Sequence, residues 1–148
     1  MARKRMFSEV VVDTDKFIEM PLGARLLYYD LGVRADDDGF VSNPKKIMKM
    51  TNISEDDYKV LVAKEFVIEF EIGVCVITHW QINNYIRSDR YKPTIYKQEK
   101  NMLQIVNGAY EKIVGIPIVN QRYTNRKSIG NRRIYVWYTK RQPLVSTV

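Results

Sequence analysis

Between residues 21 and 80 the apolar positions follow first the period of helices and then that of strands. Residues 21–34 carry apolar side chains at helical spacing, which predicts a helix packed on most of its sides. Pro21 suits the first position of that helix. The acidic run at residues 35–39 should end it, because aspartate favours turns and Gly39 can adopt a positive φ.

Two further helices are predicted at a tight corner. Asn43 is a good N-cap before Pro44, so a helix should cover residues 44–50 with its lysines on the outer face. After a short connection, Ser54 begins a sequence like a capping box, and a second helix should cover residues 54–64. The side chains that we expect this second helix to bury are Tyr58, Leu61 and Val62.

Short strands are predicted on both sides of the two helices. One covers residues 40–42, and two β-branched runs at residues 66–70 and 74–78 are joined by a turn at Gly73 that closes a hairpin. This element order is that of the second half of a winged helix-turn-helix, with the hairpin as its wing. We therefore predict an α+β fold, a winged helix-turn-helix with a C-terminal helix and a basic extension.

The flanking segments give weaker patterns. Residues 6–12 should form a short strand or an extended lead-in, and Asp13 or Thr14 can cap a helical turn at residues 15–20. Thr94 can cap a helix over residues 95–106 that ends near Asn107 and Gly108. We place a domain boundary there. Residues 1–106 would form the folded domain, and residues 107–148 a basic tail, partly disordered or a lone hairpin with a strand at 134–138.

Charge is unevenly distributed along this chain of 148 residues, whose formal net charge is +7. Residues 1–86 contain 11 Lys or Arg and 14 Asp or Glu, whereas residues 87–148 contain 13 and 3. The positive field of the last part would attract a polyanion. Next to a helix-turn-helix pattern, this favours nucleic acid over a merely solvated tail.

The candidate DNA contacts are basic and aromatic residues of the two helices and of residues 87–97. Arg and Lys bind phosphates, and Tyr can bind a phosphate or stack on a base. The helix at 54–64 would enter the major groove, with the turn at 71–73 along the backbone. The candidates are Lys45, Lys46, Lys49, Tyr58, Lys59, Lys64, Arg87, Arg90, Tyr91, Lys92 and Lys97.

Three acids at the start of the proposed recognition helix, residues 55–57, would repel phosphates. We therefore expect residues 87–97 to supply much of the electrostatic attraction. The alternative is that these residues form a loop whose basic groups pair with the domain's own acids. The basic arm at residues 3–5 is either solvated or a further DNA contact.

Nothing in the sequence indicates an enzyme, a metal site or a cofactor. It has no phosphate-binding glycine loop, no metal-ligand cluster and no nucleophile–base pair. Cys75 should be a packed core residue and His79 a surface or hydrogen-bonded one, and the run 36–38 lacks the ligand spacing of a calcium loop. A lone cysteine, no bilayer-spanning apolar run and no signal peptide predict a cytoplasmic protein without membrane contact.

Several short runs together resemble one protein family. They are Met6-Phe7, Phe17, Met20-Pro21, Leu27-Tyr28, residues 35–41, Trp80 and residues 89–94. With these runs, about residues 1–103 resemble the N-terminal domain of phage replisome organisers, replication initiation proteins of phages and prophages of low-GC Gram-positive bacteria, often grouped with DnaD-like proteins. The runs at 35–44 and 89–94 are the most specific parts.

The resemblance implies a winged helix that binds the double-stranded DNA of a phage replication origin. It also implies recruitment of helicase-loading proteins by parts further along the chain. Family members usually continue into a second region, which residues 107–148 do not match. We therefore expect origin binding and leave helicase-loader recruitment open. A truncated prophage product would account for the missing region. The alternatives are a protein–protein adaptor in replisome assembly, which the acidic residues 55–57 favour, and a phage transcription regulator. Self-pairing of the strand at 134–138 leaves a homo-oligomer open.

Overall fold

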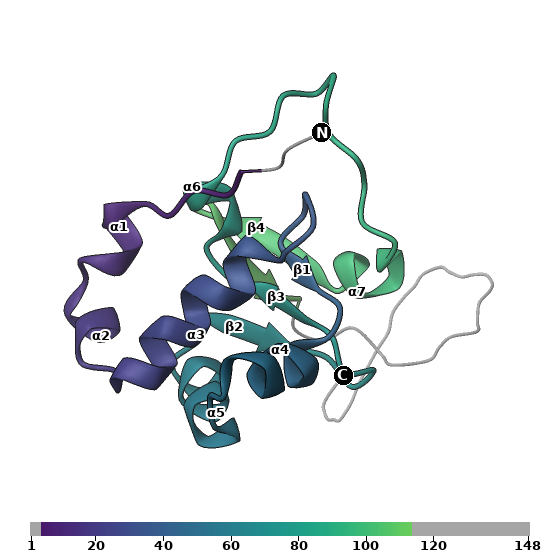
Figure 1. Cartoon of the computed structure of the whole chain (residues 1–148). Coiled ribbons are helices and arrows are strands. Elements are labelled where there is room, and N and C mark those ends of the chain that lie inside the picture. Colours follow the sequence, from purple (N-terminus) through teal and green to yellow (C-terminus); the bar gives the residue numbers. More distant parts are fainter. Residues whose placement is uncertain (1–3, 114–148) are drawn as a thin grey trace, which may run out of the picture. The chain divides into compact units, whose positions relative to one another are not determined.

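The computed structural model describes residues 4–113 (Figure 1). The chain divides into two units, residues 1–111 and 112–148, and only Lys112 and Ile113 of the second unit are described. The tail with its predicted strand at 134–138, and Arg3 of the basic arm, lie outside the described residues. The first unit is an α+β fold of short helices and two small antiparallel sheets.

Two short helices open the domain where the sequence predicted a strand or an extended segment before one helical turn. Helix α1 covers Glu9–Val12, because the Ser8 hydroxyl accepts a hydrogen bond from the Val10 N–H and caps it. The prediction for residues 6–12 is therefore wrong over this helix, since a cap and an acidic first turn outweigh the β preference of three valines. Helix α2 covers Asp15–Ile18 and is capped by Thr14, as predicted.

Helix α3 covers Leu22–Val33 and is buried or half-buried at all but three of its positions. Its inner face is buried and consists of Ala24, Leu27, Tyr28, Leu31 and Gly32. On the opposite face Leu22 is 76% exposed, Leu26 is 53% exposed and Val33 is 51% exposed. The expectation of a helix packed on most sides is therefore confirmed, except for this apolar stripe, which remains on the surface.

Helices α4 and α5 form the predicted corner. Helix α4 covers Pro44–Thr51, and the Asn43 side chain caps it by accepting from the Lys46 N–H. Asn52 ends it in the left-handed conformation, and its φ is 59°. Helix α5 covers Glu55–Ala63, and the Ser54 hydroxyl accepts from the Asp57 N–H. Local capping chemistry thus sets both ends of the corner.

Three strands form the larger sheet in the order β1-β3-β2. Strand β1 (Phe40–Val41) and strand β2 (Val67–Glu69) both pair antiparallel with the central β3 (Cys75–Ile77). The hairpin between β2 and β3 turns at Gly73, whose φ is 92°. The rings of Phe17 and Tyr28 meet that of Phe66 edge-on under this sheet, so the N-terminal helices share its core.

The C-terminal part differs from the predicted helix over residues 95–106. A short helix α6 (Trp80–Asn83) is followed much later by α7 (Lys97–Asn101), and then by a hairpin of β4 (Leu103–Val106) and β5 (Ala109–Lys112). Asn107 and Gly108 have φ values of 53° and 83°, as a type I′ hairpin turn requires. The pair Asn107-Gly108, which we predicted to end a helix, instead forms a hairpin turn.

The hairpin extends the folded domain past the boundary predicted after Val106. Tyr110 is only 4% exposed, and its N–H donates to the Thr78 carbonyl at 2.8 Å. The predicted boundary therefore falls in the turn between two paired strands.

Candidate nucleic-acid interface

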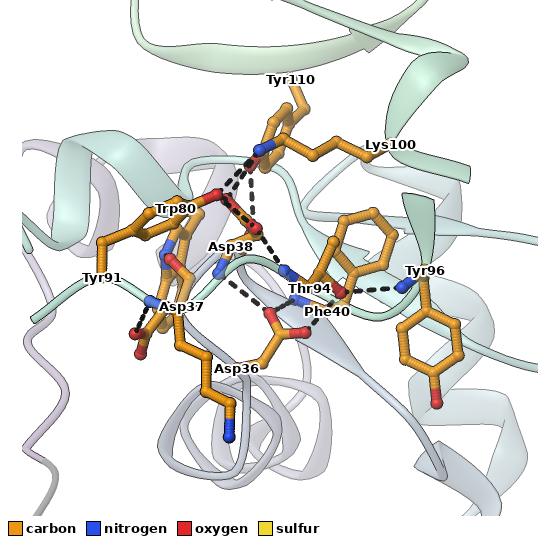
Figure 2. Close-up of polar contacts among 11 residues, drawn as sticks. Asp36, Asp37, Asp38, Phe40, Trp80, Tyr91, Thr94, Tyr96, Lys100 and Tyr110 are labelled. Atoms are coloured by element: carbon orange, nitrogen blue, oxygen red, sulfur yellow. Dashed lines mark hydrogen bonds and ion pairs between the residues drawn. The ribbon is translucent and has the colours of Figure 1, made fainter. Parts of the chain in front are cut away.

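The acidic turn between α3 and β1, residues 36–38, organises the polar interior of the domain (Figure 2). One carboxylate oxygen of Asp36 accepts from the N–H groups of Asp38 and Phe40, each at 2.9 Å. These two hydrogen bonds close the turn, and the chain ends the turn at Gly39, whose φ is 90°. The other Asp36 oxygen accepts from the Thr94 hydroxyl at 2.6 Å.

Asp38 is the most enclosed of the three acids, at 5% exposure. Its carboxylate accepts from the Tyr91 hydroxyl and the Thr94 N–H at 2.8 Å and lies 3.0 Å from the Lys100 ammonium. Its carbonyl oxygen accepts from the Tyr110 hydroxyl at 2.8 Å. Figure 2 shows these donors converging on one residue. The turn thereby holds a segment that lies more than fifty residues further along the chain.

Asp37 joins the same turn to the N-terminal arm. Its carboxylate lies 3.0 Å from the Arg5 guanidinium and accepts from the Lys92 N–H at 3.0 Å. The Arg5 side chain is 6% exposed, donates to the Ala35 carbonyl and lies 5.4 Å from the centre of the Trp80 ring. The expectation that Arg5 is solvated or contacts DNA is therefore wrong, because the acidic turn holds it inside the domain.

These contacts decide what part of the basic stretch is free to bind a ligand. Tyr91 directs its hydroxyl to Asp38, and Arg87 pairs with Asp89 at 3.1 Å on the surface. For these two residues the structure agrees with the alternative interpretation of residues 87–97, a loop whose side chains bind the domain's own acids. The side chains of Arg90, Lys92 and Lys97 remain exposed.

Arg90 and Lys92 line a pocket of about 420 Å³, which we call the cationic groove. It is also lined by Arg34, at the end of α3, by Asp36 and Asp37 of the acidic turn, and by Ser42, before α4. The groove was not predicted from the sequence. The sequence pattern predicted Arg34 only as the last residue of a helix, and no local pattern indicates that it lies near Arg90.

The two-helix corner presents the remaining candidates. Lys45, Lys46 and Lys49 are all exposed on α4, as predicted. On α5 the exposed residues are Glu55, Asp56, Lys59 and Ala63, so this face carries more acid than base. Lys64 is half-buried at the end of α5.

Tyr58 is the least accessible of the candidate DNA contacts on the two helices, because it is only 7% exposed. It lines a pocket of about 330 Å³ between α4, α5 and β2, whose charged lining residues are Lys45, Lys59, Glu55 and Glu69. As expected from the helical spacing, Tyr58 belongs to the core. Little of it is left to contact DNA, so its place among the DNA contacts is not supported by its position.

The titratable groups of the described residues offer little chemistry. Burial raises the pKa of the Cys75 thiol to about 12, so Cys75 is a packed core residue as predicted. Burial, with Lys16 nearby, lowers the pKa of His79, whose Nδ1 is buried with no hydrogen-bond partner in the described part of the chain. The expectation of a surface or hydrogen-bonded histidine is therefore wrong for Nδ1.

Tyr91 and Lys100 lie 3.0 Å apart, an arrangement that could serve proton transfer if the tyrosine ionised readily. The opposite holds, because desolvation raises the pKa of Tyr91 despite the lysine. Within residues 4–113 no group of His, Cys, Asp or Glu side chains is placed to hold a metal ion. The acidic turn is a structural element whose oxygens are already engaged.

No protein-family model, curated protein or solved structure matches this chain. None of the helices between residues 4 and 113 has the length and hydrophobicity needed to cross a lipid bilayer. The two runs that carry the resemblance to replisome organisers most specifically, residues 35–44 and 89–94, are hydrogen-bonded to each other through Asp36, Asp37 and Asp38.

Proposed function

We propose that this protein binds double-stranded DNA through a winged helix, made of α3, α4, α5 and the sheet β1-β3-β2, and acts in phage or prophage replication initiation. The observation that carries the proposal is the corner of α4 and α5, capped at both helix starts and followed by an antiparallel hairpin that turns at Gly73. Three exposed lysines on α4 give this corner a positive edge.

In this proposal α5 lies in the major groove and α4 rests on the phosphates beside it. Lys45, Lys46 and Lys49 bind phosphate oxygens, and the hairpin turn at Gly73 follows the backbone. Lys59 is the one cation on the exposed face of α5. Glu55 and Asp56 can accept from cytosine amino groups, which gives selectivity at some loss of affinity.

Replication initiation, rather than transcription control, is supported by the resemblance to phage replisome organisers. The same resemblance supports an origin as the DNA site, helicase-loading proteins as partners and the cytoplasm of a bacterial host as the place of action. A phage transcription regulator would use the same fold on another DNA site, so the sequence of the preferred duplex distinguishes the two.

The test is fluorescence anisotropy of the full chain with a duplex from its own gene and with a scrambled duplex, at several salt concentrations. Neutralising about five phosphates should give a slope of log affinity against log salt of roughly −4 to −5. Selective, salt-sensitive binding supports the proposal. A slope near zero, or equal affinity for both duplexes, contradicts origin recognition.

A pair of variants localises the contact. Lys49→Ala should reduce the magnitude of the salt slope by about 0.9, because one phosphate contact is lost. Lys16→Ala, on α2 outside the proposed interface, removes the same charge and should leave the slope unchanged. Equal effects of both variants would mean that only overall charge matters.

The second candidate function is a protein–protein adaptor in replisome assembly. It is favoured by the net acidic face of α5 and by the exposed stripe of Leu22, Leu26 and Val33 on α3, which suits an apolar partner. An adaptor should bind neither duplex and should associate with its partner, or with itself, with little dependence on salt.

A further inference from the structure

The cationic groove lies between two stretches of the domain that are distant in sequence, residues 34–42 and residues 90–96. Arg34 comes from the end of α3, Ser42 from the connection between β1 and α4, and Arg90, Lys92, Ile95 and Tyr96 from the segment before α7. Its volume of about 420 Å³ lies within the range of roughly 300–1,000 Å³ that is usual for ligand pockets. The acidic turn holds this segment in place through Thr94.

The acids at the groove are already neutralised or hydrogen-bonded, whereas the side chains of two of its three cations, Arg90 and Lys92, are not paired with an acid in the described part of the chain. Asp37 pairs with Arg5, and Asp36 accepts from Phe40 and Thr94. Within residues 4–113 the side chains of Arg90 and Lys92 have no acidic partner. Arg34 donates to the Asp30 carbonyl at 2.9 Å and has a long, exposed contact with the Asp30 carboxylate at 3.4 Å. The groove therefore attracts an anion.

The groove also has an apolar wall beside its cations. Ile95 is 82% exposed, so its side chain is accessible to a ligand in the groove. The Tyr96 ring is half-buried and held by the Phe40 ring at 5.9 Å. A rigid aromatic ring next to an exposed aliphatic side chain can receive the flat face of a nucleobase.

Of the two forms of DNA, only the unpaired strand presents its phosphates and the faces of its bases together. A double helix presents phosphates outward but stacks its bases inside, so it could use the cations of the groove and not its apolar wall. We propose that the cationic groove binds single-stranded DNA, with phosphates at Arg34, Arg90 and Lys92 and a base against Ile95 and Tyr96. The choice of DNA rests on the proposed function, whereas the single-strand preference rests on the groove alone.

The proposal gives the protein a second DNA surface, separate from the lysines of α4. Ser42 lines the groove three residues before Lys45, so the groove lies next to the start of the helix that we propose contacts the duplex. A protein with both surfaces could hold duplex and opened strand at the same time, as a replication start requires.

The test uses the full chain and a fluorescently labelled dT12 oligonucleotide in anisotropy titrations at several salt concentrations. Three phosphate contacts on a single strand should give a log–log salt slope of about −2. The double variant Arg90→Ala, Lys92→Ala should weaken binding about tenfold or more and reduce the slope to about −0.7, because only Arg34 remains. The hydrogen bond from the Lys92 N–H to Asp37 is kept in this variant, because it uses the backbone.

The matched control is Arg87→Ala, which removes a cation from the same loop but outside the groove. It should leave the affinity for dT12 within about twofold, since its charge is already paired with Asp89. If Arg87→Ala weakens binding as much as the double variant does, or if the double variant binds dT12 like the unaltered chain, the groove is not the site.

The base contact is tested with an abasic 12-mer and with Ile95→Ala. Ile95→Ala should weaken binding of dT12 and not of the abasic strand, whereas equal loss for both would overturn the base contact. Tighter binding of rU12 than of dT12 would overturn the assignment to DNA. Lys49→Ala should leave dT12 binding unchanged, so a failure of the duplex proposal and a failure of this one give different results.

Discussion

The Asp38 carboxylate accepts a hydrogen bond of 2.8 Å from the hydroxyl of Tyr91, a residue 53 positions further along the chain. Lys100 lies 3.0 Å from the same carboxylate. Although burial lowers the pKa of Lys100, its hydrogen bonds to Tyr91 and Asp38 raise it overall, so the ammonium stays charged. These contacts hold in place the segment that forms one side of the cationic groove.

Replacing Asp38 with Asn should destabilise the domain. The amide keeps the shape of the side chain but loses the charge that Lys100 faces. It also places an NH₂ group where two hydrogen-bond donors converge. The free energy of unfolding should therefore fall by about 3 kcal/mol. Urea denaturation measures it. The control Asp89→Asn removes an exposed pair and should cost less than about 0.5 kcal/mol. Similar losses in both variants would show that the buried contacts add little.

Gly39→Ala should be far more damaging than Gly73→Ala, although both glycines have a φ near 90°. A Cβ at Gly39 would lie 2.7 Å from the Trp80 ring, whereas one at Gly73 would meet nothing within 4 Å. We expect about 1 kcal/mol of backbone strain at Gly73 and about 3 kcal/mol or more at Gly39. Thermal unfolding of the two variants gives the comparison, and equal losses would contradict a rigid Trp80.

Stability should fall as the pH is lowered through the titration of His79. Burial lowers the pKa of this side chain in the folded state, so the unfolded state binds the proton more readily. The contribution is fully present above the ordinary pKa of about 6.5 and is lost as the pH falls from there through the folded pKa. The slope of unfolding free energy against pH between 7 and 5 should be smaller in His79→Gln. An unchanged slope would assign the effect to other groups.

The single thiol should be unreactive in the folded protein. Cys75 has no exposed surface, and burial raises its pKa to about 12, so almost no thiolate is available at pH 8. A colorimetric thiol reagent should label it only as fast as the domain opens, and at once in urea. Rapid labelling under native conditions would mean that β3 opens locally.

The sequence predicted the elements whose limits are set by neighbouring residues. Asn43, Ser54 and Thr14 act as caps where local chemistry placed them, and Gly73 turns the hairpin. The error over residues 95–106 has the same origin, because Asn-Gly suits both a helix end and a type I′ turn. Only the burial of Tyr110 against the sheet decides between them.

The acidic turn and the cationic groove could not be predicted in this way. Asp36, Asp37 and Asp38 were correctly read as a turn, but their partners lie 53 to 72 positions ahead or 32 behind, beyond any local pattern. Arg5 looked like part of a solvated arm for the same reason. Burial of a like-charged run becomes understandable only when its distant donors are known.

The position of these donors also sets an order of events during synthesis. A chain emerging from the ribosome presents the acidic turn long before Tyr91, Lys100 and Tyr110 have been made. Until then the Asp38 carboxylate has no buried partner and must stay hydrated, so this side chain cannot be buried. Contacts of such long sequence separation slow folding. The helical corner can therefore form early, while the groove is completed only when translation has passed residue 110.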